Sequence, residues 1–426
     1  MIREAWSRTA RDAVYGIAIS KNGEYIVTGS WDKTIACYDR LGKILWSYKS
    51  GGQVWGTDIC DDGSYVIGGS TDKNVYCFKW KEKIFARYRV GSPIWSVAIS
   101  SDGRYIVAGA EDGNVYFFER GSGKLFWSAA TKNAVYGVGI SSDGRYVVAG
   151  SGDTNVYCYG FGKELWKYTT NGLVWGIGIS RIGNYVVAGS EDGWIYCFDI
   201  KGRILWRHFL EERPWGVRIS DRGEFVVVGS ERGYIYCLKG KNGQLLWKFD
   251  TKSPSNPVYS VAVSGNGEYI VACSKKESIF FFENLGPASK HAIERVKSLI
   301  RVGSGTDFDL SDAKKIIEKA EEAFARNDYA LALDLAKNAE NYTKEIPKYH
   351  VLDRKLVQNW LFSLGVVEKA AEASPDLIRI VGPLYIKTEE ISSDRTVGEK
   401  IVGYEEKVET FKNILKNYEK IALKER

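Results

Sequence analysis

Aromatic side chains recur at one position of a seven-residue motif that the sequence contains seven times. In each copy an apolar residue precedes the aromatic residue and Gly or Ser follows it, as in VWGIGIS at 174–180. The aromatic residues are Tyr15, Trp55, Trp95, Tyr136, Trp175, Trp215 and Tyr259. Because the faces of aromatic rings attract Lys and Arg side chains by about 0.5–2 kcal/mol per contact, this pattern favours recognition of a cationic group.

No constellation of residues that performs covalent chemistry emerges from the sequence. There are three histidines, His208, His291 and His350, and no HExxH, GxSxG or GxxxxGK[ST] pattern. Asp58 and Arg218 replace small residues of the repeated motif, where they either polarise a channel or pair with neighbouring residues. We therefore expect a protein that is not an enzyme, with no catalytic residue, cofactor or bound metal.

The seven cysteines do not form a metal-binding pattern. Five of them, Cys37, Cys77, Cys158, Cys197 and Cys237, recur about 40 residues apart inside apolar segments, and no CxxC pair exists. We expect them to be free thiols that act as small buried hydrophobic side chains.

Composition and charge indicate a globular protein in the cytoplasm. The 426 residues have a net charge of +6, and residues 285–426 contain 24 basic and 24 acidic residues, so the excess lies before them. No apolar run approaches the roughly 20 residues that span a bilayer, and the segment MIREAWSRTARDA lacks the apolar stretch of a secretory signal. A single Met, few Gln and abundant Lys and Glu resemble thermophile usage.

The elements that carry the aromatic residues form a repeat. Successive aromatic residues are 40, 40, 41, 39, 40 and 44 positions apart. Each repeat contains four short β-rich runs separated by Gly, Asp and Asn turns, as in VWGIGIS, YVVAGS, WIYCFD and ILWRHF of the fifth repeat. Four strands in about 40 residues is typical of propeller blades. The sequence therefore predicts an all-β seven-bladed propeller over residues 1–284.

The N-terminal segment predicts how the propeller closes. The fourth run of most repeats carries a Trp, and the seventh repeat, which ends in SIFFFENLGP, has no fourth run. Trp6 of EAWSRTA lies nine residues before Tyr15, as Trp46 lies nine before Trp55. We expect this segment to be the outer strand of blade seven, since closure leaves no unpaired sheet edge between the two ends.

Residues 1–284 resemble the WD-repeat propellers. GSWDKTIACYD at 29–39 follows the family's second turn and third strand, and the turn aspartate Asp32 recurs as Asp72, Asp112, Asp153 and Asp192 but is replaced by Arg232 and Lys276. The family's histidine is absent. GKLFW, GKELW and GQLLW are instead similar to repeats of pyrroloquinoline-quinone-type propellers. The enzymes of that group are eight-bladed exported proteins with an adjacent cysteine pair, which this chain lacks, so we do not expect a quinone cofactor.

The WD-repeat resemblance implies a contact surface at the top mouth of the channel. It assigns peptide contacts to the seven aromatic residues and to the residues just before the turn aspartate, namely Trp31, Glu111 and Glu191. Glu231 matches the same place in a blade that lacks the aspartate. Aromatic rings beside carboxylates suit an inserted Lys or Arg of a partner. Alternatively, Trp175 shares strand parity with Ile177 and Ile179, and the aromatic residues then pack between blades without a guest.

The connectors between the third and fourth strands are basic. They contain Arg40, Lys43, Lys79, Lys81, Lys83, Arg120, Lys124, Lys163, Lys201, Arg203, Lys239 and Lys241. A polyanion could bind them with salt-sensitive affinity, although solvated loops explain the same residues and are the interpretation we favour.

After Phe282 the period changes to that of helices. We expect a linker and short helix over 285–310 and an α-helical domain over 311–426. A hairpin over 311–345, with a turn at Asn327 and Asp328, resembles a tetratricopeptide repeat through Tyr329, Ala332 and Ala339. Further helices are expected over 351–373 and 375–390. A helix over 397–424 has a heptad stripe that forms either a homodimer or a contact inside its own bundle.

Together these features favour a non-catalytic interaction scaffold. It would bind a protein or peptide at the top mouth and use the helical domain as a second interaction or oligomerisation surface. The alternative is a propeller that binds a small molecule or carbohydrate, with enzymatic activity at the mouth of the channel. That alternative requires carboxylates deep in the mouth, where Asp58 is the candidate.

Overall fold

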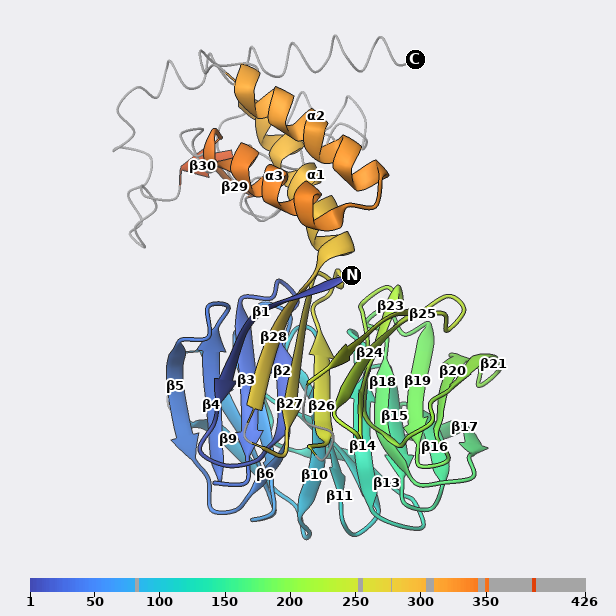
Figure 1. Ribbon diagram of the computed structural model, residues 1–426. Coiled ribbons are helices and arrows are strands. Elements are labelled where there is room, and N and C mark those ends of the chain that lie inside the picture. The colour runs from blue at the N-terminus through green and yellow to red at the C-terminus, as the bar shows by residue number, and fades with distance from the viewer. Residues whose placement is uncertain are drawn as a thin grey trace, which may run out of the picture. The chain divides into compact units, whose positions relative to one another are not determined.

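The computed structural model describes residues 1–80, 84–251, 256–276, 278–303, 310–343, 349–351 and 385–387. The chain divides into two compact units, one of residues 1–298 with 315–338 and one of residues 299–314 with 339–426. Within the described residues, the first unit contains seven four-stranded antiparallel sheets, which are the blades of the expected propeller (Figure 1).

Each blade is a meander whose strands follow one another from the channel outward. Blade one contains β2 (Val14–Ile19), β3 (Tyr25–Ser30), β4 (Thr34–Asp39) and β5 (Ile44–Lys49). Blade two contains β6 (Val54–Ile59), β7 (Tyr65–Ser70), β8 (Asn74–Lys79) and β9 (Ile84–Arg89). Blade three contains β10 (Ile94–Ile99), β11 (Tyr105–Ala110), β12 (Asn114–Glu119) and β13 (Leu125–Ala130). Blade four contains β14 (Val135–Ile140), β15 (Tyr146–Ser151), β16 (Asn155–Gly160) and β17 (Lys163–Thr169). Blade five contains β18 (Val174–Ile179), β19 (Tyr185–Ser190), β20 (Trp194–Asp199) and β21 (Ile204–Phe209). Blade six contains β22 (Pro214–Ile219), β23 (Phe225–Ser230), β24 (Tyr234–Lys239) and β25 (Leu245–Asp250). Blade seven contains β26 (Val258–Val263), β27 (Tyr269–Ser274) and β28 (Ser278–Asn284), together with β1 (Ile2–Thr9).

The turn from the first to the second strand has the same backbone in every blade. It contains a glycine in the left-handed region, with φ between 71° and 77°, at Gly23, Gly63, Gly103, Gly144, Gly183, Gly223 and Gly267. Residues with a Cβ atom rarely adopt this conformation, so the glycine fixes where each inner strand ends.

Strand β1 closes the propeller as the sequence predicts. It pairs antiparallel with β28, and Trp6 opposes Phe281 in this register. Blade seven therefore combines strands from the two ends of the propeller sequence.

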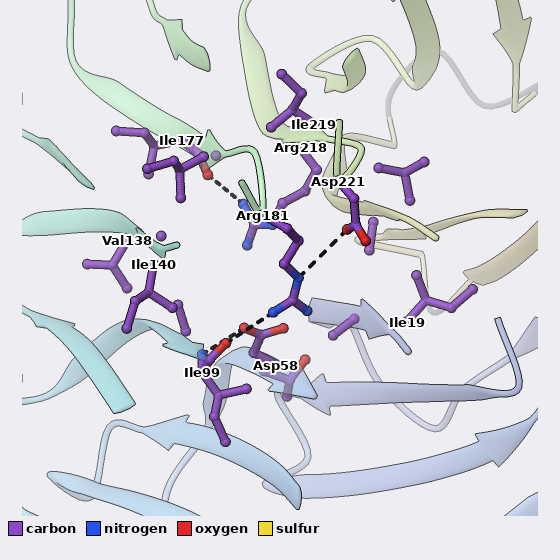
Figure 2. Close-up of a pocket in the computed structure, with 18 of the residues that line it drawn as sticks. Ile19, Asp58, Ile99, Val138, Ile140, Ile177, Arg181, Arg218, Ile219 and Asp221 are labelled. Carbon is purple, nitrogen blue, oxygen red and sulfur yellow. Dashed lines mark hydrogen bonds and ion pairs between the residues drawn. The ribbon is translucent and has the colours of Figure 1, made fainter. Parts of the chain in front are cut away.

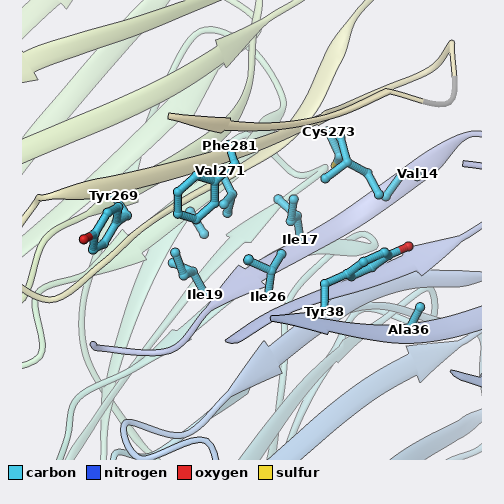
Figure 3. Packing of buried hydrophobic residues seen from close by; sticks show 12 residues of the cluster. Val14, Ile17, Ile19, Ile26, Ala36, Tyr38, Tyr269, Val271, Cys273 and Phe281 are labelled. Carbon is cyan, nitrogen blue, oxygen red and sulfur yellow. The ribbon is translucent and has the colours of Figure 1, made fainter. Parts of the chain in front are cut away.

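The core lies between neighbouring blades. At the closure, Ile17 and Ile26 of blade one pack with Val271 and Phe281 of blade seven, and each is at most 2% exposed (Figure 3). Complete burial of such a side chain stabilises the fold by about 1.5–3 kcal/mol. The β-branched residues that the sequence places on the strands thus hold adjacent sheets together.

Three helices follow the last strand of the propeller: α1 (Leu285–Gly303), α2 (Ser311–Ala325) and α3 (Tyr329–Asn341). Helix α1 is longer than the short helix expected within 285–310. The turn between α2 and α3 is at the expected position, where Asn327 has a φ of 62°. Ala332 and Ala339 are fully buried, as the tetratricopeptide resemblance implies.

Part of the region expected to be helical contains strands. β29 (Tyr349–Val351) pairs with β30 (Tyr385–Lys387), so the helix expected over 375–390 is wrong at 385–387, and Val351 does not begin a helix. Both strands are short and rich in Tyr, Val and Ile, which favour strands once a partner is available. The helix predicted over 397–424 and the rest of the one over 351–373 lie outside the described residues.

Candidate functional site

The aromatic residue of the repeated motif is the extra residue of a β-bulge in every blade. In blade one Val14 pairs with Ser30 and Gly16 pairs with Gly29, which leaves Tyr15 between two ladder positions. The same shift occurs in the other six blades. A bulge interrupts the ladder and redirects a side chain, here at the start of the strand that lines the channel.

The seven aromatic residues form a closed circle, which we call the aromatic circle. Ring centroids are separated by 4.1 Å for Tyr15–Trp55, 4.4 Å for Trp55–Trp95, 5.5 Å for Trp95–Tyr136, 3.9 Å for Tyr136–Trp175, 4.6 Å for Trp175–Trp215, 5.5 Å for Trp215–Tyr259 and 4.4 Å for Tyr259–Tyr15. All seven side chains are half-buried. They therefore pack against one another across blades while each keeps part of its surface exposed, which combines the two arrangements that the sequence left open.

In five blades a glycine follows the aromatic residue, and the spacing of the inner strands requires it; Ser96 and Ser260 take this position in blades three and seven. A Cβ atom at Gly176 would lie 2.6 Å from the carbonyl oxygen of Trp215, and one at Gly56 would lie 2.8 Å from the Cα atom of Ser96. Such distances are shorter than real contacts allow, so the prediction that these glycines make room where the strands converge is confirmed.

Carboxylates and one further tryptophan flank the aromatic circle. The indole N–H of Trp175 donates a hydrogen bond to Glu191 Oε1 at 2.9 Å. The Trp31 ring, which is 39% exposed, lies 5.6 Å from Tyr15 and 5.7 Å from Trp55 between centroids.

The other two predicted carboxylates, Glu111 and Glu231, differ in their surroundings. Burial raises the pKa of Tyr136, and the negative charges of Glu191 and Glu111 raise it further, which places Glu111 within electrostatic range of the circle. Glu231 Oε2 lies 4.0 Å from Arg213 Nε, so its charge is partly neutralised. The flank is therefore most acidic beside Tyr136 and Trp175.

Three of the turn aspartates, Asp72, Asp153 and Asp192, anchor the loops that lead into the inner strands. Asp192 Oδ2 accepts hydrogen bonds from the Tyr196 hydroxyl at 2.8 Å and from the Asn171 amide at 3.0 Å. Asp72 and Asp153 make equivalent bonds to Tyr76 with Gly51 and to Tyr157 with Lys132. In these three blades the turn aspartate thus holds the loop before the inner strand in place through a tyrosine hydroxyl and a backbone amide.

In blades six and seven, a residue of the loop before the inner strand takes the place of the missing turn aspartate. Glu212, in the loop before β22, accepts hydrogen bonds from the Tyr236 hydroxyl and, at 2.9 Å, from the Arg232 amide. In blade seven Asn256 accepts a bond from the Lys276 amide at 2.6 Å. Sequence reasoning missed both, although the loop position of Glu212 relative to Arg232 was the available signal.

Comparison with known families agrees with this architecture. A family model described as the lambda-carrageenase beta-propeller domain matches residues 25–132 and 185–298, just over half of the chain. The chain belongs to this beta-propeller family. Residues 7–39 are also similar to the WD domain, G-beta repeat, and residues 111–190 to the model of the outer membrane protein assembly factor BamB. No curated protein matches the chain.

The mixed character of this family member is visible blade by blade. The WD-domain match begins within β1 and ends with β4, and it includes the turn aspartate Asp32. The BamB match runs from residue 111 to the end of β19, and it includes both GKLFW and GKELW. Both resemblances drawn from the sequence are therefore confirmed, the first in blade one and the second from blade three to blade five.

Asp58 and Arg218 of this propeller line a cavity in the channel (Figure 2). Each is the fifth of the six residues of its inner strand, whereas the aromatic residue is the second. Asp58 Oδ2 accepts a hydrogen bond from the Ile99 amide at 2.8 Å, and Arg218 Nη1 donates to the Ile177 carbonyl at 2.8 Å. Each side chain is thus tied to the backbone of a neighbouring blade. Within the described residues neither forms an ion pair within 4 Å.

Potential metal ligands and nucleophiles are not grouped in the described part of this propeller. Its residues contain no set of three His, Cys, Asp or Glu side chains that could hold a metal ion. All seven cysteines are free and buried, as expected. His291 contacts Glu268, and His208 lies on β21 at the outer edge of blade five.

Several basic connector residues have structural partners. The Arg40 guanidinium lies 4.5 Å from the Tyr269 ring centroid, and that of Arg120 lies 3.5 Å from the Tyr65 ring centroid. Both contacts join neighbouring blades, and cation–π pairs of this kind stabilise the structure. Lys81 and Lys83 lie outside the described residues, and binding of a polyanion by the remaining connectors stays a prediction.

Among the helices that the structure describes, none combines the length and apolar character that crossing a membrane requires.

Proposed function

We propose that this propeller is a non-catalytic scaffold that binds a protein or peptide on the aromatic circle. The observation that carries the proposal is the circle itself: seven half-buried aromatic side chains raised by seven bulges, beside the carboxylates of Glu191 and Glu111. A structural core does not need exposed rings at the end of a channel, and a cluster of partly exposed aromatic side chains of this size is characteristic of contact surfaces.

The packing of the circle defines how a guest binds. Because all adjacent centroids are 3.9–5.5 Å apart, the rings fill the mouth and offer a surface rather than an open hole. A Lys or Arg side chain of the partner lies on the exposed ring faces near Trp175 and Glu191, where ring faces and carboxylates both attract it. The free, buried cysteines support a reducing compartment, and we place the interaction in the cytoplasm.

A second candidate is carbohydrate binding, which the family description favours. The matched family model is named for a lambda-carrageenase, and stacked aromatic side chains hold sugar faces as well as cations. In this case a sugar ring lies on the circle and the propeller either binds the carbohydrate or acts on it.

The two candidates differ in the ligand class that the circle selects. A displayed library of random peptides and an array of neutral and sulfated oligosaccharides are screened against the full chain. A variant that carries Glu111→Gln, Glu191→Gln and Glu231→Gln keeps the shape of every side chain and is screened in parallel. Enrichment of Lys or Arg at one peptide position, lost in the variant, supports the scaffold.

The opposite result is equally informative. Binding of oligosaccharides without basic peptides, retained in the glutamine variant, replaces the scaffold by the carbohydrate candidate. A further variant with Trp175→Ala and Trp215→Ala must lose the selected ligand in either case, because both candidates use the ring faces. Retention of the ligand by that folded variant would contradict both.

A further inference from the structure

One acidic and one basic side chain interrupt a row of small residues inside the channel. The fifth residue of the repeated motif is Asp58 in blade two and Arg218 in blade six. In the other blades it is Ala18, Ala98, Gly139, Gly178 and Ala262. All seven positions line one cavity of about 90 Å³ (Figure 2). Because the small residues leave space at this level, the two charged groups face a cavity and not a packed core.

Both charged side chains are held in fixed positions. Asp58 accepts hydrogen bonds from the amides of Ile59 at 2.9 Å and Ile99 at 2.8 Å, one on each carboxylate oxygen. Arg218 donates from Nη1 to the carbonyls of Ile177 at 2.8 Å and Val217 at 3.0 Å. A carboxylate oxygen accepts more than one hydrogen bond, and a guanidinium has five donors, so both groups retain bonding capacity toward the cavity.

Four other charged residues at or beside the cavity form ion pairs with one another. Arg181 Nη2 lies 3.0 Å from Asp61 Oδ1, and its Nε lies 3.8 Å from Asp221 Oδ1. Lys21 Nζ lies 3.4 Å from a carboxylate oxygen of each of these two aspartates. In Figure 2 the side chain of Arg181 extends between Asp221 and Asp58. These four residues neutralise one another, whereas Asp58 and Arg218 form no ion pair among the described residues.

A polar side chain that lacks a hydrogen-bond partner also lines this cavity. Thr57 is 3% exposed, and its hydroxyl has no hydrogen-bond partner among the described residues. A buried hydroxyl that lacks a partner costs free energy unless a water molecule or a ligand satisfies it. The cavity therefore presents three unsatisfied or partly satisfied polar side chains: Asp58, Arg218 and Thr57.

We propose that this cavity binds a small zwitterion of the size of glycine, with its carboxylate on Arg218 and its ammonium group on Asp58. The volume is several times the roughly 10–15 Å³ that one water molecule needs, so a ligand of a few non-hydrogen atoms fits. A simple anion would be attracted by Arg218 but repelled by Asp58, and a simple cation would be attracted by Asp58 but repelled by Arg218. A zwitterion satisfies both buried charges at once, which is what a low-dielectric site requires.

The test is an NMR titration of the full chain with glycine, acetate and methylammonium. Acetate and methylammonium each carry one of the two charges of glycine and serve as matched probes. We expect glycine to bind at least about tenfold more tightly than either, since each lost charge-assisted contact costs about that factor or more. The variant Asp58→Ala with Arg218→Ala carries at both positions the residue of blades one, three and seven, and should fold and lose glycine binding.

Two further variants make the outcome decisive. Asp58→Asn keeps the shape of the side chain but removes its charge, and should shift the preference from glycine to acetate. Arg203→Ala removes a peripheral arginine that pairs with Asp199 and should leave binding unchanged. Equal affinity for acetate and glycine in the intact protein, no binding of any probe, or unchanged glycine binding in the double variant would each overturn the proposal.

Discussion

Trp6 and Phe281 stack with their ring centroids 5.4 Å apart and their planes 10° from parallel, although they come from the first and last strands of the propeller. The indole N–H of Trp6 also donates to the Arg40 carbonyl of blade one at 2.8 Å. One side chain therefore joins the closing strand both to its own blade and to the next one.

Replacement of Trp6 by Ala should open the closure first. We expect a loss of about 3 kcal/mol in the stability of this region, because both the stacking and the hydrogen bond disappear. Hydrogen exchange measures it: amides of β1 and β28 should lose protection while those of β10 and β11 keep theirs. Leu125→Ala, at an exposed position of an outer strand, is the control and should change neither region.

The substitute for the turn aspartate in blade six predicts a difference between two adjacent glutamates. Glu212→Ala leaves the Tyr236 hydroxyl and the Arg232 amide without their acceptor, and should cost about 1.5–3 kcal/mol. Glu211→Ala changes an exposed side chain and should cost little. Urea unfolding of the two variants compares them, and equal midpoints would show that Glu212 does not anchor the loop.

The contact between Glu268 and His291 predicts a stability maximum in mildly acidic solution. Hydrogen bonding to Glu268 Oε2 at 2.8 Å, opposed by burial, raises the pKa of His291. Burial alone would raise the pKa of Glu268, but the bonds from His291, Tyr269 and Asn266 hold it below its usual value. The histidine contribution is complete below its unfolded pKa of about 6.5 and is lost as the pH rises through the folded value. The glutamate contribution is present above about 4.5 and is lost as the pH falls through its folded value.

NMR titration of the histidine side chains checks the direction of these shifts. His291 should titrate above 6.5, whereas His208, whose pKa is lowered by burial, should titrate below it. Glu268→Gln should return His291 toward its ordinary pKa and leave His208 unchanged. A His291 pKa that does not respond to this substitution would be inconsistent with the contact.

The cysteines should be unreactive while the propeller is folded. Burial raises the pKa of the Cys37, Cys77, Cys158 and Cys197 thiols to about 12 and that of Cys60 to about 11. Since the thiolate is the reactive form, an aromatic disulfide reagent at pH 8 should label none of the seven thiols before unfolding and all of them in denaturant. Rapid labelling of the native protein would contradict this burial.

The acidic flank of the aromatic circle should determine how tightly a basic peptide binds. Glu191→Gln retains an acceptor for the Trp175 indole but removes the charge, and should weaken a selected basic peptide by about tenfold. The salt dependence of its affinity should fall as well. Fluorescence anisotropy of the labelled peptide measures both, with Glu164→Gln on an outer strand as the control. Unchanged affinity and salt dependence would remove Glu191 from the contact.

The sequence by itself determined the blades, their number and their closure. Strand period, turn glycines and the repeated Trp are local or strictly periodic signals, so Trp6 could be assigned to blade seven by its distance from Tyr15 alone. The need for a small residue behind each aromatic residue, Gly in five blades and Ser in two, was also predictable, because seven strands that converge on one channel leave little room there.

Only the tertiary structure decided what the aromatic and charged residues do. Whether Trp175 faces solvent or its neighbours depends on a bulge and on the rings of adjacent blades, which no single repeat specifies. Glu212 replaces a turn aspartate from a different loop, and the two meet only when the blade folds. Asp58 and Arg218 lie four blades apart in sequence and line the same cavity because the propeller closes, and it is this closure that turns two isolated substitutions into a candidate site.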